Sequence, residues 1–151
     1  MPEIIIADTS CLIVLSNIKE LDILHRLYGS ITITPEVASE YVHELPAWIK
    51  IKTAKDKLTQ LVLEMQIDKG ESSAIALALE IPNSTLILDD YKARRVALHL
   101  GLTFTGTMGI IIKSKLNGII PSIKPLLKKI KQTDFRLADE IELQALKEAG
   151  E

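Results

Sequence analysis

Five carboxylates stand where strand-like segments end or in the helix-like segments beside them. Asp8 follows the apolar run IIIA, and Asp89 and Asp90 follow the run STLIL. Glu40 comes after the run SITIT, and Glu71 lies in the first turn of GESSAIALALE. Carboxylates gathered in one place repel one another and resist joint ionisation unless a cation neutralises them. The pattern therefore predicts a site for a hard divalent cation.

The chemistry open to such a site is hydrolysis at phosphorus. Mg²⁺ takes oxygen ligands, keeps several waters and bridges readily to phosphate oxygens, and a water activated in this way can attack a phosphodiester in line. Each acid also has a structural interpretation. Asp8 and the Asp89–Asp90 pair can cap the helices that follow them, Glu71 can interact with a helix dipole, and Glu40 can be a solvated helix residue. The hypothesis depends on their joint placement.

The elements that must position these acids alternate between strands and helices. We expect strands over EIIIAD, SITIT, STLILDD and LTFTG, and a short edge strand or extended loop at residues 48–51. The expected helices cover residues 9–18 with Ser10 as N-cap, residues 21–27, a segment that starts at Pro35, and residues 55–65, 70–80, 91–101, 107–118, 122–131 and 138–149.

This alternation predicts parallel strands with right-handed crossovers in a three-layer α/β/α domain, which we expect to span residues 1–151 as one unit. Ligands bind such sheets at the carboxyl ends of the strands. Asp8, the Asp89–Asp90 pair and Thr107 all follow predicted strands, so we expect them at one edge. Thr107 can orient a water or a phosphate there, or it can cap the next helix.

Composition limits the partners and the compartment. The formal charge is −2 and aromatic residues make up 4% of the 151 residues, which argues against a global basic field and against a base-stacking sheet. The single Cys11 excludes an intrachain disulfide and fits a reducing cytosol. The first residues carry no basic segment of a signal peptide, and no apolar run is long enough to span a bilayer. We therefore expect a cytoplasmic protein without a membrane partner.

Several blocks, taken in order, resemble those of the PIN domain family. They are DTSCLIVL, PEVASEYV, GESSAIALALE, LILDDYKARRVALHLG and TGTMGIIIKSK. The likeness covers nearly the whole chain and is closest to an uncharacterised bacterial and archaeal branch related to the VapC-type toxins. It implies an α/β/α fold, cleavage of single-stranded RNA with Mg²⁺ or Mn²⁺, and a place as the toxin of a toxin–antitoxin pair.

The resemblance also implies roles for individual residues. Asp8 matches the first acid of the family, and Ser10 matches a nearby hydroxyl or amide position. Glu40 matches the second acid. Glu71 resembles the third, although typical toxins carry Asp near this block, and the longer side chain moves the carboxylate oxygens away from the backbone.

The block LDDY resembles the strand end that carries the fourth acid. Asp90 matches that acid and Asp89 is its neighbour, and the sequence leaves open which of the two faces the site. Leu88 stands where the family often has Thr, so one hydroxyl is missing. Thr107 is expected to support the site from the next strand end.

The resulting functional hypothesis is a metal-dependent endoribonuclease with Asp8, Glu40, Glu71 and Asp90 as catalytic acids. The metal ligands would be Asp8, Asp89, Asp90 and Glu71. The alternative is a catalytically weak or inactive PIN-like module that binds nucleic acid or dimerises.

Partners are predicted from neighbouring surface residues. Lys92, Arg94 and Arg95 follow the last acids closely and can contact RNA phosphates, although a solvated helix face explains them equally well. We also expect a small antitoxin protein as partner, and a homodimer that uses apolar surface near Trp48 and in the C-terminal part.

Overall fold

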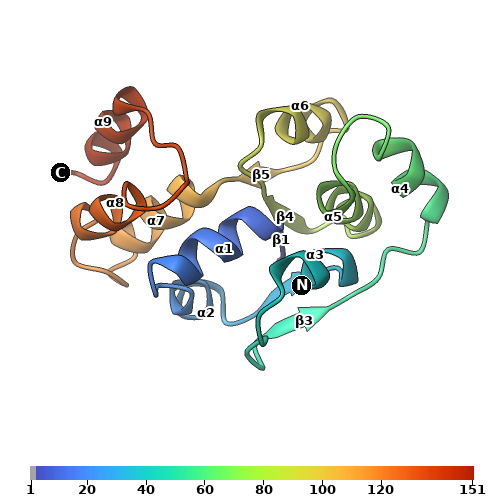
Figure 1. Cartoon of the computed structure of the whole chain (residues 1–151), viewed down its shortest axis with the longest axis horizontal. Helices are drawn as coiled ribbons and strands as arrows, with labels where there is room; N and C mark the ends of the chain where they lie inside the picture. The colour runs from blue at the N-terminus through green and yellow to red at the C-terminus, as the bar shows by residue number, and fades with distance from the viewer. Residues whose placement is uncertain (1–2) are drawn as a thin grey trace.

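A computed structural model describes residues 3–151 and contains a central sheet of five parallel strands (Figure 1). The order across the sheet is β3-β2-β1-β4-β5, so β1 is central. The strands are β1 (Ile4–Ala7), β2 (Ile31–Ile33), β3 (Ile49–Ile51), β4 (Ser84–Ile87) and β5 (Phe104–Thr105). With helices on both faces, this is the expected three-layer α/β/α architecture.

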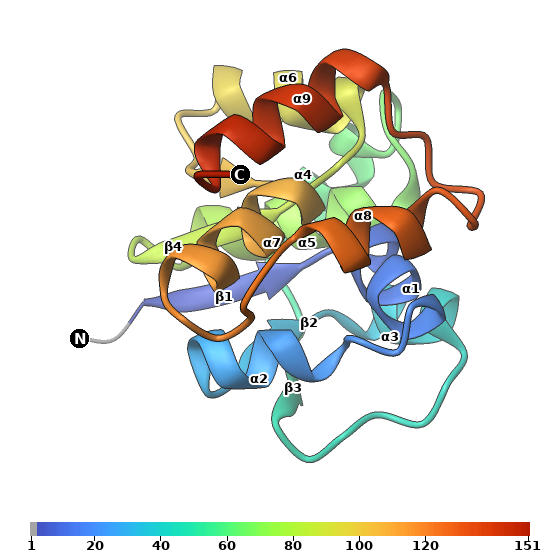
Figure 2. The ribbon, with the colours of Figure 1, turned by 90° about the vertical axis from the view of Figure 1, so that its left-hand side faces the viewer.

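Nine helices are formed within residues 3–151. They are α1 (Thr9–Asn17), α2 (Asp22–Tyr28), α3 (Pro35–Tyr41), α4 (Lys57–Leu63), α5 (Lys69–Glu80), α6 (Tyr91–His99), α7 (Thr107–Leu116), α8 (Lys124–Ile130) and α9 (Asp139–Glu148). In Figure 1, α4, α5 and α6 lie at one end of the molecule and α7, α8 and α9 at the other, with α1 between them. Figure 2 shows α9 and α8 stacked beside α7.

The sheet separates two apolar cores. Ile5 and Ala7 of β1 pack into the core formed with α1, α2, α3 and the C-terminal helices, whereas Ile6 packs into the core formed with α5 and α6. Successive strand residues point to opposite faces. Because both faces are covered, β1 can be a continuous apolar run without polar alternation.

Local chemistry explains most helix starts. Thr34 accepts a hydrogen bond from the backbone N–H of Val37 (3.2 Å), and Pro35 occupies the first turn of α3. Asp68 and Glu71 form a reciprocal capping box at the start of α5. Asp90 caps α6 by accepting from the backbone N–H of Ala93 (2.9 Å).

Some predicted boundaries were wrong. Ser10 is not an N-cap: α1 already begins at Thr9, and Asp8 holds the N-cap position without a side-chain cap hydrogen bond. The helix predicted at residues 55–65 covers only Lys57–Leu63, and its start is set by Asp56, which accepts from the backbone N–H of Thr59 (3.0 Å). Residues 48–51, expected to form a short edge strand or an extended loop, contain the edge strand β3. None of the helices within residues 3–151 has the length and apolar character needed to cross a bilayer.

Candidate active site

Parallel pairing brings the ends of β1 and β4 to one edge of the sheet. Ala7 is in register with Ile87, and the backbone N–H of Asp8 donates to the carbonyl of Ile87 (3.1 Å). The chain that leaves β4 therefore passes beside Asp8. Asp8 and Asp89 share the predicted edge, and β5 ends beside them and leads directly into Thr107.

Asp8 is buried at the centre of this edge. The residue is 5% exposed, and its Oδ1 atom has no hydrogen-bond partner. Burial raises the pKa of Asp8 from 3.8 to about 7; a backbone hydrogen bond from Thr9 opposes this shift, and the negative charges of Asp68, Glu40 and Asp89 reinforce it. An ionised carboxylate oxygen without a partner in a buried position is a group that a cation would stabilise.

Glu71 is a second buried carboxylate with a perturbed pKa. Burial, helped by the negative charges of Asp68, Asp8 and Asp90, raises its pKa from 4.5 to about 8, and a backbone hydrogen bond from Asp68 opposes this shift. In the capping box Glu71 accepts from the backbone N–H of Asp68 (3.3 Å) and its own N–H donates to Asp68 Oδ1 (2.8 Å). Glu71 therefore takes part in the helix cap and also lies close to the other acids of the site.

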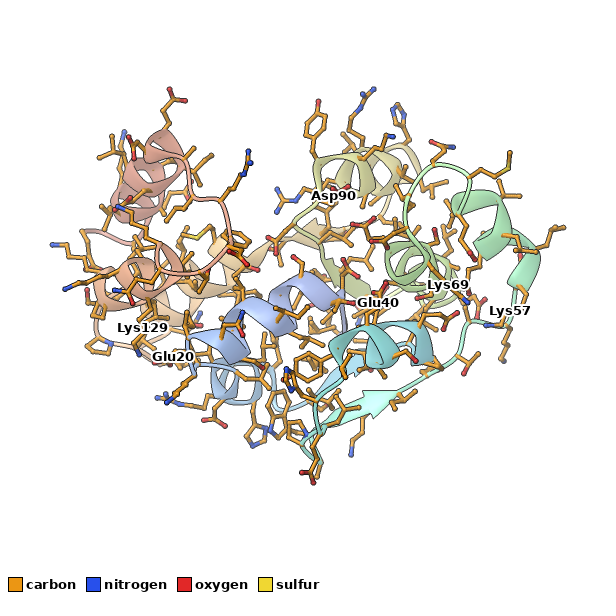
Figure 3. The ribbon with its side chains drawn as sticks, in the orientation of Figure 1. Glu20, Glu40, Lys57, Lys69, Asp90 and Lys129 are labelled. Atoms are coloured by element: carbon orange, nitrogen blue, oxygen red, sulfur yellow. The ribbon has the colours of Figure 1, made fainter. Side chains whose placement is uncertain are left out.

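Glu40 reaches the same place from α3. Thr9 Oγ1 donates to Glu40 Oε1 (2.6 Å), which connects Glu40 to the residue after Asp8. Figure 3 shows Glu40 between α3 and the start of α5, where Lys69 is labelled. The carboxylate lies so close to Gly70 that a Cβ added there would be 2.1 Å from Glu40 Oε1. A cavity of about 320 Å³ is lined by Asp8, Thr9, Ser10, Ile13, Glu40, Asp68 and Glu71.

Asp89 and Asp90 have different environments. Asp89 accepts hydrogen bonds from the Thr107 N–H (2.8 Å), Thr107 Oγ1 (2.5 Å) and Ser10 Oγ (3.2 Å). The two predicted supporting residues, Ser10 and Thr107, thus both bind Asp89. Asp90 lies at the start of α6 (Figure 3), is exposed, and accepts a hydrogen bond from the backbone N–H of Ala93. Leu88 is fully buried in the core beside α5 and α6, so the hydroxyls at this edge come from Ser10 and Thr107 instead.

The three predicted RNA contacts also differ. Arg94 donates from Nε to the carbonyl of Leu88 (2.6 Å), and its guanidinium lies 5.4 Å from the ring centroid of Phe104. Arg95 lies over the ring of Tyr91 at 5.9 Å, and Lys92 is exposed. The Arg94 side chain is therefore held against the sheet edge by these contacts, whereas Arg95 and Lys92 lie on the outer surface of α6.

The carboxylate oxygens at this edge are suitable ligands for a hard divalent cation, but they are not arranged around one point. Among the residues that the structure describes, no three Asp, Glu, His or Cys side chains are placed to hold a metal ion together. Glu40, Glu71, Asp89 and Asp90 each accept hydrogen bonds from the protein, while Asp8 Oδ1 accepts none. All the candidate ligands are carboxylate oxygens, the type that Mg²⁺ and Mn²⁺ prefer.

Two residues at this edge were missed by sequence reasoning. Asp68 caps α5, and its charge also raises the pKa of both Asp8 and Glu71. Arg136 lies in the loop between α8 and α9 and lines a cavity with Glu71, Asp89 and Asp90. The capping pattern around Asp68 was a usable signal, since it placed two acids at one helix start. No local pattern marks Arg136.

Comparison with known families decides the family. The PIN domain family matches residues 4–151 of the chain. The chain belongs to the PIN domain family. PIN domains are generally nucleases and typically use divalent metal ions, which agrees with an edge made of carboxylates. The comparison with curated proteins found no match to this PIN domain.

Proposed function

We propose that this PIN domain is an Mg²⁺- or Mn²⁺-dependent endoribonuclease that cuts single-stranded RNA. The observation that supports it best is the buried, unpartnered Oδ1 of Asp8, with the charges of Asp68, Glu40 and Asp89 acting on it. Asp8, Glu71, Asp89 and Asp90 are the proposed ligands, and Glu40 completes the site. A bound Mg²⁺ or Mn²⁺ would offset the clustered charge and supply an activated water for attack on a phosphodiester.

The protein groups have separable roles in this proposal. Ser10 and Thr107 hold the carboxylate of Asp89, and Thr9 holds that of Glu40, so both are oriented before any ligand arrives. The buried position of Asp8 keeps bulk water from most of its carboxylate. We expect products with a 5′-phosphate and a 3′-hydroxyl, as the family likeness implies.

Cleavage of a labelled single-stranded RNA tests the proposal. The wild-type chain should cut with Mn²⁺ or Mg²⁺ and lose activity in EDTA, and Asp8→Asn should be inactive. The matched control is Asp56→Asn, which makes the same chemical change at an exposed helix N-cap remote from the acidic edge and should leave cleavage unchanged. Metal-independent cleavage, or full activity of Asp8→Asn, would contradict the proposal.

A second candidate is a PIN module that binds without turnover. It is favoured by the capping box, in which Asp68 and Glu71 already satisfy each other, and by the absence of a gathered triad of ligands within residues 3–151. This candidate predicts that RNA binds and stays intact with either metal. The cleavage assay therefore separates the two candidates.

We further propose that the protein is cytoplasmic, acts as a toxin with a small antitoxin partner, and forms a homodimer. Trp48, near which a dimer contact is expected, is partly buried and stacks on His25 with ring centroids 5.2 Å apart. An exposed apolar stripe on and just after α4 is a better-placed protein contact; it consists of Leu58, Leu61, Val62 and Met65. Light scattering tests the dimer, and an adjoining gene for a small protein tests the antitoxin.

A further inference from the structure

A second cavity, of about 650 Å³, opens from the acidic edge toward the C-terminal helices. Glu71, Asp89 and Asp90 line it on one side, and loop 131–138 between α8 and α9 lines it on the other. In Figure 1 the loop that leads from α8 into α9 and the start of α6 lie on opposite sides of α1. The C-terminal part of the chain therefore contributes directly to the surface around the proposed reaction centre.

Arg136 brings a positive charge to this cavity. It is exposed, and within residues 3–151 its side chain forms no hydrogen bond, ion pair or ring contact. The other cation that lines the cavity, Arg94, already donates to the carbonyl of Leu88. A free guanidinium presents a planar set of donors that matches a phosphate. It can also offset the repulsion that the acidic wall exerts on an incoming phosphate.

Tyr91 adds an aromatic surface to the same cavity. It is the first residue of α6, it is 74% exposed, and Arg95 lies over its ring. An exposed aromatic ring beside an arginine suits the stacking of an unpaired base. A duplex would keep its bases stacked on one another and away from Tyr91, so the combination favours a single strand.

We propose that this cavity binds a stretch of single-stranded RNA, with Arg136 contacting a backbone phosphate and Tyr91 stacking on a base beside it. The inference deepens the proposed function, because it takes RNA as the substrate and assigns the residues that position it. Arg136 and Tyr91 are thus substrate-binding residues that flank the acidic edge from two different parts of the chain.

Equilibrium binding of a labelled single-stranded RNA to the full chain tests this inference without turnover. Fluorescence anisotropy is measured in Ca²⁺, a hard oxygen-seeking cation, at several salt concentrations, and gels check that the RNA stays intact. Arg136→Gln should weaken binding and flatten the slope of log affinity against log salt by about 0.7, the value for one phosphate contact on a single strand. Arg136→Lys should keep most of that slope. Tyr91→Ala should weaken binding roughly five- to 150-fold, and Tyr91→Phe should preserve it.

Lys52→Gln is the matched control. Lys52 is exposed just after the edge strand β3, so this variant removes the same charge from a different surface. The inference is overturned if Arg136→Gln and Lys52→Gln bind RNA alike, if Tyr91→Ala binds like wild type, or if the wild type does not bind. The first two results leave metal-dependent cleavage, and with it the proposed function, standing, whereas a wild type that neither binds nor cuts single-stranded RNA would overturn both proposals. Conversely, the expected binding pattern without any cleavage in Mn²⁺ would support the cavity and remove the nuclease proposal.

Discussion

Replacing Asp8 by Asn should stabilise the metal-free protein, and the effect should depend on pH. The pKa of Asp8 is raised to about 7 from an ordinary 3.8, so the folded protein holds a proton here that the unfolded chain has released. The contribution of Asp8 to the free energy of unfolding is therefore fully present below about pH 4. It is lost as the pH rises toward 8, because the folded protein must then release a proton from a buried carboxyl group. Asn stays neutral throughout and avoids this loss.

The magnitude follows from the size of the shift. A rise of about 3 pKa units, at 1.36 kcal/mol each, corresponds to about 4 kcal/mol at pH 8 or above. For a chain of this size that equals a gain in melting temperature of roughly 8–16 °C. Near pH 4 the two proteins should melt together, because Asp8 is then protonated in the folded wild type.

Thermal melts of both proteins between pH 4 and 9, in EDTA and in Mn²⁺, check the reasoning. Mn²⁺ at 100 times its dissociation constant should stabilise the wild type by about 2.7 kcal/mol and the variant by much less. Asp56→Asn is the control: hydrogen bonds from Thr59 lower the pKa of Asp56, so this variant should be no more stable than wild type at pH 8. If Asp8→Asn shows no gain at pH 8, or the same gain at pH 4, the buried-charge account is wrong.

Three other substitutions test neighbouring features. Gly70→Ala should change the free energy of unfolding by no more than about 1 kcal/mol, since alanine favours the helix and the added methyl group clashes only with the flexible end of Glu40. RNA cleavage should nevertheless fall by about 100-fold, because Glu40 is displaced. A fully active variant would show that Glu40 is dispensable. Thr107→Val should destabilise the protein by about 1.5–3 kcal/mol in urea unfolding, because it removes a hydroxyl donor to the Asp89 carboxylate. Leu61→Lys should turn the proposed homodimer into a monomer in light scattering, and an unchanged mass would exclude the exposed α4 stripe as the contact.

Local sequence rules predicted the elements of this fold well. Apolar runs marked the strands, and short-range chemistry marked helix starts such as Pro35, because the residues that favour a helix N-terminus lie within its first turn. The parallel arrangement followed from the alternation of elements, and it placed Asp8 and Asp89 at one edge. What could not be predicted depends on contacts across long separations.

The environments of Asp89 and Asp90 illustrate that limit. Adjacent and chemically identical, they differ because Ser10 and Thr107, far away in sequence, bind only Asp89. Arg136 is a further case, since it reaches the acidic edge only through the packing of α8 and α9. The roles of these residues, as opposed to their positions in strands and helices, required the three-dimensional structure.

The central position of β1 has a consequence for how the protein is made. Ile4 pairs with Ser84, so the first strand of the chain obtains one of its two neighbours only after some 80 further residues have been synthesised. Its pairing with β2 closes a much shorter loop and is available earlier. Long-range parallel pairing is slow to form, and we expect β1, β2 and β3 to associate before β4 arrives. Because Asp89 and Thr107 follow β4 and β5, a nascent chain cannot assemble the acidic edge until most of the protein has left the ribosome.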